Sequence, residues 1–114
     1  MAKTYYMNLN PLPFSLIKSG KKKIEMRLNK DNRDKIKKDD FIIFKNNQSQ
    51  EIVKVIVTSV SKFSDFEELY KHFDKSLLGY DEDEIADPND MLTYYSKEMI
   101  KEHGVLGIGI EISK

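Results

Sequence analysis

Cysteine is absent from this chain of 114 residues, and only two histidines are present. The lack of cysteine excludes disulfide bonds, thiolate metal sites and cysteine nucleophiles. His72 and His103 cannot build a metal site by themselves, so we expect neither a metal nor a cofactor. No apolar run is long enough to span a membrane, and the N-terminus lacks the apolar core of a signal peptide. We therefore expect a cytoplasmic protein.

Hydrophobic residues make up 39% of the chain and charged residues 33%, which indicates a globular rather than a disordered protein. The length suits one domain, so we expect residues 1–114 to fold as a single unit with its own core. The many Lys, Asn and Ile residues suggest a bacterial genome rich in A and T.

The net charge of zero hides an uneven distribution. Residues 1–38 contain eleven Lys or Arg and three acids, whereas residues 39–114 contain eight Lys or Arg and sixteen acids. Six of these acids lie between Asp81 and Asp90. This distribution favours one positive face over a generally basic surface, but the two halves could equally neutralise each other in the fold.

The most informative pattern is G-x-K-x-x-E-x-R, formed by Gly20, Lys22, Glu25 and Arg27. Arg binds phosphate through a planar fork and Lys binds it as a point charge. A carboxylate between them can hold the guanidinium, accept a hydrogen bond from a ligand or move protons. The alternative is a solvated strand edge with scattered charges, because a motif is only a hypothesis until its context agrees.

The segment that carries the motif alternates between apolar and polar residues. Ile24, Met26 and Leu28 would share one face, which leaves Glu25 and Arg27 together on the other. Strict alternation would place the lysine of the motif on the apolar side. We therefore expect that lysine in the turn that leaves the preceding helix, from where its long stem can reach the polar face.

Five strands and three helices are expected along the chain. The strands are predicted at residues 4–9, 22–28, 41–44, 51–61 and 106–112, and the helices at 11–17, 64–73 and 88–104. Ser64 and Glu67 form a capping box for the second helix, and Asp87 precedes a proline at the start of the third. Apolar residues on both faces of 51–61 predict a central strand covered on both sides. Gly107 and Gly109 leave one face of the last strand without side chains, which predicts tight packing in the barrel.

These elements predict an α+β fold. The strands are not regularly interleaved with helices, as they would be in repeated βαβ units. A small mixed β-barrel, or a strongly curved sheet with helices packed over its openings, fits the order best.

The sequence resembles the ASCH domain family, which belongs to the PUA-like superfamily. The resemblance covers nearly the whole chain and rests on several groups of residues: the G-x-K-x-x-E-x-R motif, the Pro-x-Pro-Phe helix before it, Asp40-Phe41-Ile42-x-Phe44, Ser64 with Phe66-x-x-Leu69, Tyr94-Tyr95-Ser96-x-Glu98 and Gly104-Val105-Leu106-Gly107-Ile108. It implies a PUA-like mixed β-barrel of five to six strands with about three flanking helices. It also implies a cleft beside the barrel where the charged residues of the motif gather and RNA or a nucleotide binds.

A binding module for single-stranded RNA or a nucleotide is the first functional hypothesis. Lys22 and Arg27 would contact phosphates, and Glu25 would accept a hydrogen bond from a base or a ribose hydroxyl. Tyr94 would offer a surface for base stacking. It should be more exposed than Tyr95, which shares a face with apolar neighbours.

An enzyme is the second hypothesis, and the sequence leaves the choice open. Some small ASCH proteins, which this chain resembles, remove the acetyl group of N4-acetylcytidine with a Lys, a Thr and a later acid. Lys22 matches that lysine, but Glu25 stands at the threonine position, and the acid would be Asp87 or Asp90. If the protein is an enzyme, it would be a hydrolase of this kind or a ribonuclease, and Lys22 and Glu25 would be its catalytic residues. A third hypothesis is that the acidic segment 79–90 binds a basic protein partner.

Overall fold

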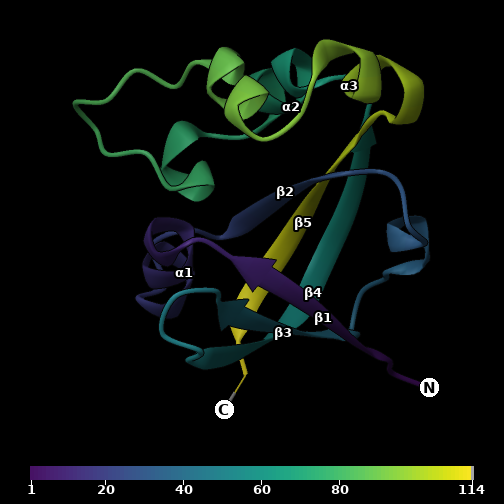
Figure 1. Cartoon of the computed structure of the whole chain (residues 1–114), viewed down its shortest axis with the longest axis vertical. Helices are drawn as coiled ribbons and strands as arrows, with labels where there is room; N and C mark the ends of the chain where they lie inside the picture. Colours follow the sequence, from purple (N-terminus) through teal and green to yellow (C-terminus); the bar gives the residue numbers. More distant parts are fainter. Residues whose placement is uncertain (114) are drawn as a thin grey trace.

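The computed structural model describes residues 1–113 (Figure 1). Its strands are β1 (Thr4–Leu9), β2 (Ile24–Leu28), β3 (Phe41–Asn46), β4 (Ile52–Phe63) and β5 (Val105–Ile112). Its α-helices are α1 (Pro11–Lys18), α2 (Phe66–His72) and α3 (Lys97–His103). Three short 3₁₀ helices, η1 (Arg33–Lys35), η2 (Lys75–Leu78) and η3 (Pro88–Thr93), complete the order.

The five strands form one mixed sheet in the order β1-β3-β4-β5-β2. Strands β1 and β3 are parallel, and the other neighbouring pairs are antiparallel. The sheet curls into an open half-barrel with β1 and β2 as its two free edges (Figure 1). The predicted α+β fold with a small mixed barrel is therefore confirmed, and the barrel is open on one side.

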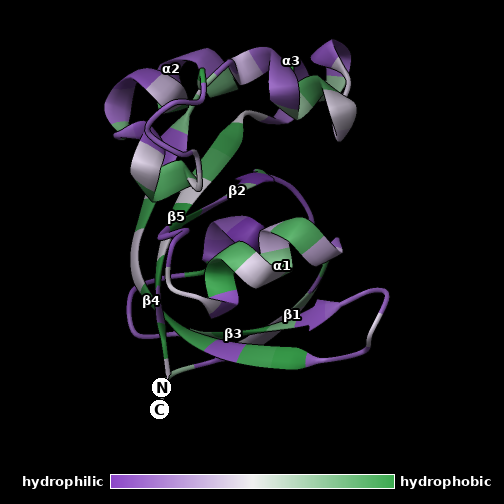
Figure 2. Ribbon diagram, turned by 90° about the vertical axis from the view of Figure 1, so that its left-hand side faces the viewer, coloured by the Kyte–Doolittle hydropathy of each residue, from purple (hydrophilic) through white to green (hydrophobic). Residues whose placement is uncertain are grey.

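Two apolar clusters fill the molecule. One lies inside the half-barrel, where α1 covers the concave face of the sheet (Figure 2). Its members are Met7, Leu9, Phe14, Ile17, Ile36, Ile42, Phe44, Val55, Val57, Leu106, Ile108 and Ile110. The other lies between β2 and the helical cap made by α2, η3 and α3 at the top of Figure 1, and it contains Ile24, Met26, Leu28, Phe66, Leu69, Leu78, Met91, Ile100 and Val105.

Helix α1 begins and ends where the sequence predicts. Pro11 occupies its first turn, where a missing N–H group costs nothing. Gly20 follows its last turn with a φ of +82°, a left-handed conformation that glycine adopts without strain. The backbone N–H of Lys22 then donates to the carbonyl of Leu16 at 2.9 Å. Lys22 therefore lies in the turn between α1 and β2, as predicted.

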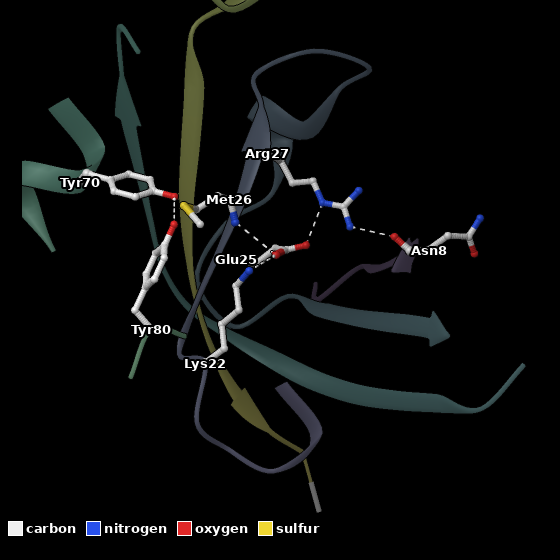
Figure 3. Close-up of polar contacts among 7 residues, drawn as sticks. All are labelled: Asn8, Lys22, Glu25, Met26, Arg27, Tyr70 and Tyr80. Atoms are coloured by element: carbon white, nitrogen blue, oxygen red, sulfur yellow. Dashed lines mark hydrogen bonds and ion pairs between the residues drawn. The ribbon is translucent and has the colours of Figure 1, made fainter. Parts of the chain in front are cut away.

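The predicted alternation of β2 is confirmed. Ile24, Met26 and Leu28 are buried in the cluster under the helical cap. Glu25 and Arg27 point to the opposite side, toward the gap between the two free edges of the sheet (Figure 3). The local sequence pattern therefore fixes which side chains enter the cap and which reach the gap.

Strand β4 is central, but the prediction that both of its faces are covered is wrong. Val55 and Val57 are fully buried in the half-barrel, whereas Ile52 is 60% exposed and Ile56 is only half-buried. α1 packs inside the half-barrel, and the helical cap packs against β2 and Phe63 at one end of the sheet. The opposite, convex face around Ile52 is open to solvent.

The capping box predicted at Ser64 and Glu67 is also wrong. Asp65 is the N-cap of α2, and its carboxylate accepts the backbone N–H of Glu68 at 2.9 Å. The same spacing of three residues is present one position later in the sequence. Aspartate is at least as good a cap as serine, so the structure uses the second of two overlapping signals.

The continuous helix predicted over residues 88–104 is interrupted. Asp87 accepts the N–H of Asn89 and begins η3, as expected of a residue before proline. Ser96 then acts as a second N-cap, with its hydroxyl accepting the N–H of Met99, so α3 starts anew. A serine that caps a new helix competes with continuation of the old one, which explains the break.

Strand β5 connects the two clusters. Leu106, Ile108 and Ile110 are buried as predicted, but Ile112 is 40% exposed. The tight packing predicted at the two glycines is confirmed, because an added Cβ at Gly107 would lie 2.8 Å from Cε2 of Phe73 and one at Gly109 would collide with the side chains of Thr58 and Ser59. No helix within residues 1–113 has both the length and the hydropathy needed to cross a membrane.

Candidate functional site

Three charged residues of the motif meet at the gap between β1 and β2 (Figure 3). Nε of Arg27 donates to Oε2 of Glu25 at 2.9 Å, and Nζ of Lys22 lies 3.4 Å from Oε1 of the same carboxylate. The N–H of Met26 also donates to Oε1 at 3.2 Å. Glu25 is therefore held on both oxygens, between one cation from the α1–β2 turn and another from its own strand.

Glu25 is almost completely buried, with only 2% of its surface exposed. Burial by itself would raise the pKa of this carboxyl group. The charges of Lys22 and Arg27, together with their hydrogen bonds, outweigh burial and hold the pKa of Glu25 below its ordinary value. The carboxylate is thus ionised at neutral pH and acts as the counterion of both cations.

Arg27 also bridges the two free edges of the sheet. Its Nη2 donates to the backbone carbonyl of Asn8 on β1 at 3.0 Å (Figure 3). The two strands are not paired with each other, so this guanidinium connects them where the barrel is open. The remaining N–H groups of Arg27 make no hydrogen bond with the described residues.

A pocket of about 310 Å³ opens at this gap. Asn8 and Asn10 line it from the β1–α1 side, and Asn47 lines it from the β3–β4 turn. The motif residues form the β2 side, and Met91, Tyr94 and Tyr95 form the side of the helical cap. The volume lies at the lower end of the range for small-molecule sites in proteins, about 300 to 1,000 Å³.

The two tyrosines differ in exposure, as predicted. Tyr94 is 54% exposed, whereas Tyr95 is half-buried and its ring stacks on Phe66 with centroids 6.0 Å apart. Tyr94 therefore has a ring surface available at the mouth of the pocket. Tyr95 belongs mainly to the packing of the cap.

The sequence analysis did not identify the three asparagines of the pocket. Nδ2 of Asn47 donates to Oδ1 of Asn10 at 2.8 Å, and Asn8 contributes its carbonyl to Arg27. Polar residues at the ends of strands resemble ordinary loop residues, and nothing in the local pattern connects positions 37 residues apart.

The later acids considered for an enzyme do not reach the pocket. Oδ2 of Asp90 accepts from the hydroxyl of Tyr80 at 2.7 Å, and that hydroxyl also contacts Tyr70, the tyrosine pair drawn in Figure 3. Asp87 lines a separate pocket between α2 and α3. Glu25 is thus the only acid among the described residues that line the pocket at the gap.

The basic and acidic halves of the chain contact each other at two exposed ion pairs. Lys18 pairs with Glu51, and Lys21 pairs with Asp81 of the acidic segment. Part of the uneven charge is therefore neutralised within the fold. Among residues 1–113, no group of three or more His, Asp or Glu side chains is arranged to hold a metal ion.

Comparisons with known proteins agree with this architecture. The ASCH domain model matches residues 7–113. The crystal structure of the hypothetical protein PH0355 is 30% identical, with a TM-score of 0.80, and the match covers 96% of this chain and 99% of that one. Protein PF0455 from Pyrococcus furiosus is 29% identical, with a TM-score of 0.68 over 97% of this chain and 98% of its own.

An ASCH domain from Lactobacillus crispatus has the same fold at 14% identity, with a TM-score of 0.68 over 95% of this chain and 79% of its own. No curated protein sequence matches the chain. The match to the family model extends over nearly all of the described fold and includes strands β2 to β5 whole and the second half of β1. The chain belongs to the ASCH domain family.

Proposed function

We propose that this protein binds single-stranded RNA or a nucleotide in the pocket at the gap between β1 and β2. The observation that carries the proposal is the buried Glu25, which holds Lys22 and Arg27 side by side on the pocket wall. Two cations fixed by one internal carboxylate leave one positive charge in excess. That excess is suited to a phosphate group.

The cations keep donors for a ligand. Lysine has three N–H donors and arginine five, and Glu25 and Asn8 use only some of them. Both side chains are largely withdrawn from water, with 10% of Lys22 and 13% of Arg27 exposed. A phosphate that enters the pocket would meet them in a region of low dielectric, where the attraction is stronger than on an open surface.

A single strand suits the pocket better than a duplex. Recognition of duplex DNA in its major groove commonly uses a basic helix or a basic two-stranded ribbon. Here the two cations lie in a recess, and α1 carries only Lys18 as a basic residue. An unstacked base can enter a recess and stack on an aromatic ring such as Tyr94, whereas a paired base cannot.

The same geometry gives less support to hydrolysis. Both oxygens of Glu25 already accept hydrogen bonds or pair with cations, and its pKa is held low. A carboxylate in that state is a weak general base, because proton abstraction is most efficient when the pKa lies near the working pH. The pocket also lacks a second acid among its described lining residues.

Binding measurements on matched lysine variants test the proposal. Fluorescence anisotropy would follow a labelled single-stranded RNA of mixed sequence and a DNA duplex of equal length, at equal salt. Lys22→Met keeps the apolar stem and removes the charge, and we expect about tenfold weaker RNA binding, the equivalent of one charged contact. Lys23→Met removes the same charge from the exposed neighbour, which does not line the pocket, and should change affinity by less than about twofold.

Equal losses in the two variants would show diffuse attraction to the basic segment and would contradict the proposed site. Tighter binding to the duplex than to the single strand would contradict the proposed ligand class. Incubation of the wild-type protein with N4-acetylcytidine, followed by chromatography, covers the enzymatic alternative. Formation of cytidine would contradict the proposed binding function and support hydrolysis instead.

A further inference from the structure

Asn10 occupies the N-cap position of α1 without capping the helix. Its side chain makes no hydrogen bond to the helix backbone, although asparagine is among the best N-cap residues. The sequence favours this departure. Pro11 and Pro13 stand at the first and third helical positions and have no N–H group, so only the N–H of Leu12 remains to donate to a capping side chain. The Asn10 side chain is thus released from its usual structural role.

The released side chain joins the pocket wall instead. Oδ1 of Asn10 accepts from Nδ2 of Asn47, and both residues line the pocket that contains Lys22 and Arg27. The backbone N–H of Asn47 donates to the carbonyl of Leu9 at 2.9 Å, which fixes the turn against β1. Nδ2 of Asn10 and Oδ1 of Asn47 make no hydrogen bond with the described residues. The pair therefore presents one free amide donor group beside one free acceptor.

A donor beside an acceptor is the arrangement that reads a nucleobase. Asparagine and glutamine amides recognise bases through such two-point contacts, because the polar edge of a base carries adjacent donors and acceptors. A phosphate or a sugar hydroxyl alone would not need both groups. The amide pair therefore matches the part of a nucleotide that the two cations do not recognise.

Charge and volume limit the ligand to one nucleotide. Lys22 and Arg27 are the only cations among the described residues that line the pocket, and Glu25 neutralises one of their charges. The remaining charge balances one phosphodiester, which carries one negative charge. The pocket of about 310 Å³ is small for a ligand site, so adjacent nucleotides of a strand would lie outside it.

We propose that the pocket holds a single nucleotide, with its phosphate at Lys22 and Arg27 and the polar edge of its base against the Asn10–Asn47 pair. This inference rests on the proposed RNA- or nucleotide-binding function and adds the size of the ligand and the residues that select its base.

The test uses labelled single-stranded oligoribonucleotides of two, four and eight residues in each of the four bases. It also uses the four ribonucleoside 5′-monophosphates as competitors. For the wild-type protein we expect affinity to stop rising beyond two residues, and log K to fall against log salt with a slope of about −0.7, the value for one phosphate of a single strand. We expect the best and worst bases to differ by about tenfold.

Asn10→Ala and Asn47→Ala should each reduce that difference between bases to within about twofold, with the salt slope unchanged. Asn89→Ala, at an exposed asparagine on η3, is the matched control and should keep the wild-type preference. Thermal unfolding checks that each variant folds. Asn10→Asp is a second variant, which keeps the acceptor for Asn47 but replaces the free amide donor with a carboxylate oxygen. It should change the order of affinities among the four bases.

Affinity that grows steadily with oligonucleotide length would overturn the single-nucleotide inference and leave RNA binding itself intact. A salt dependence that corresponds to contacts with several phosphates would do the same. A base preference that survives in both alanine variants, or no base preference in the wild type, would overturn the assignment of the amide pair. Absence of binding to every probe would refute the proposed function, and the inference would fall with it.

Discussion

Glu25 is both buried and charged. It is 2% exposed, and it is the counterion of two basic side chains from different segments. Removal of one partner from a buried ion pair is costly, because the remaining charge loses its compensation without regaining water. Glu25 therefore positions Lys22 and Arg27 rather than acting on a ligand by itself.

Glu25→Gln should destabilise the protein at neutral pH. The amide keeps the shape of the side chain but leaves Lys22 and Arg27 with no acid beside them. We expect a loss of about 2 kcal/mol in the free energy of unfolding, below the range for fully buried pairs because both cations retain some exposure. Urea denaturation at pH 7 measures this loss, and a change within experimental error would contradict the counterion role.

The pH dependence of that loss follows from the direction of the pKa shift. The folded-state pKa of Glu25 lies below its ordinary value of 4.5. The ionised carboxylate thus contributes stability that is fully present above about pH 4.5 and is lost as the pH falls through the folded pKa. The difference in the free energy of unfolding between wild type and Glu25→Gln should therefore shrink below pH 4.5. The pKa of Asp40 is also lowered, so protonation of Asp40 in acid destabilises both proteins alike.

At the scale of the elements, the pocket exists because the barrel is open. Strands β1 and β2 are edge strands, and the backbone groups on their free edges are unpaired with each other. Arg27 connects them through the carbonyl of Asn8 and the carboxylate of Glu25. The guanidinium serves both as a ligand contact in the proposed function and as a link across the opening.

Arg27→Lys should loosen that link while keeping the charge. An ammonium group lacks the planar fork that reaches Glu25 and Asn8 together. Loss of one hydrogen bond costs about 1 kcal/mol, so amide exchange in β2 should speed up about fivefold while β4 stays unchanged. Arg33→Lys is the control, because Arg33 has no ion pair with the described residues. Equal protection of β2 in both variants would argue against the link.

Much of this architecture could be predicted from local patterns. Alternation in β2 and the proline and glycine that bound α1 are signals contained in a few residues, and the structure confirms both. Errors arose where two local signals competed. Ser64 and Asp65 offered overlapping caps, and Ser96 interrupted a helix that the apolar spacing would have continued.

The walls of the pocket could not be predicted in the same way. Asn10 and Asn47 meet only because the β3–β4 turn folds back against β1. Nothing in either local sequence indicates that contact. The cluster of Lys22, Glu25 and Arg27 was visible because its members are within six residues of one another. Local chemistry is therefore readable from the sequence, whereas the surfaces that complete a site depend on tertiary contacts.

The N-cap of α2 can be tested directly with two substitutions. Asp65→Ala removes the side chain that accepts the N–H of Glu68 and should cost about 1 kcal/mol of stability. Ser64→Ala removes a side chain with no capping role and should cost less than about 0.5 kcal/mol. Chemical denaturation of the two variants measures both values. The reverse order would restore the capping box at Ser64.

At the scale of the whole molecule, the half-barrel and the helical cap meet along β2 and β5. The pocket lies between these two parts, with β1, β2 and the β3–β4 turn on the barrel side and η3 on the cap side. Among residues 1–113, its lining contains Lys22 and Arg27 with Glu25 as the only acid, while no residue of the acidic segment 79–90 lines it, and Asp81 of that segment pairs with Lys21. A negatively charged ligand is therefore directed to the gap rather than to the cap.

Titration of ¹⁵N-labelled protein with a short single-stranded RNA, followed by NMR, tests the central claim most directly. The claim predicts the largest shifts at the Nε–H of Arg27, the backbone amides of residues 22–27 and the side-chain amides of Asn10 and Asn47. Tyr94 should also shift, and the amides of the convex face around Ile52 should not. Unchanged signals at Arg27 and Lys22, with shifts confined to the cap or the convex face, would contradict the proposed site.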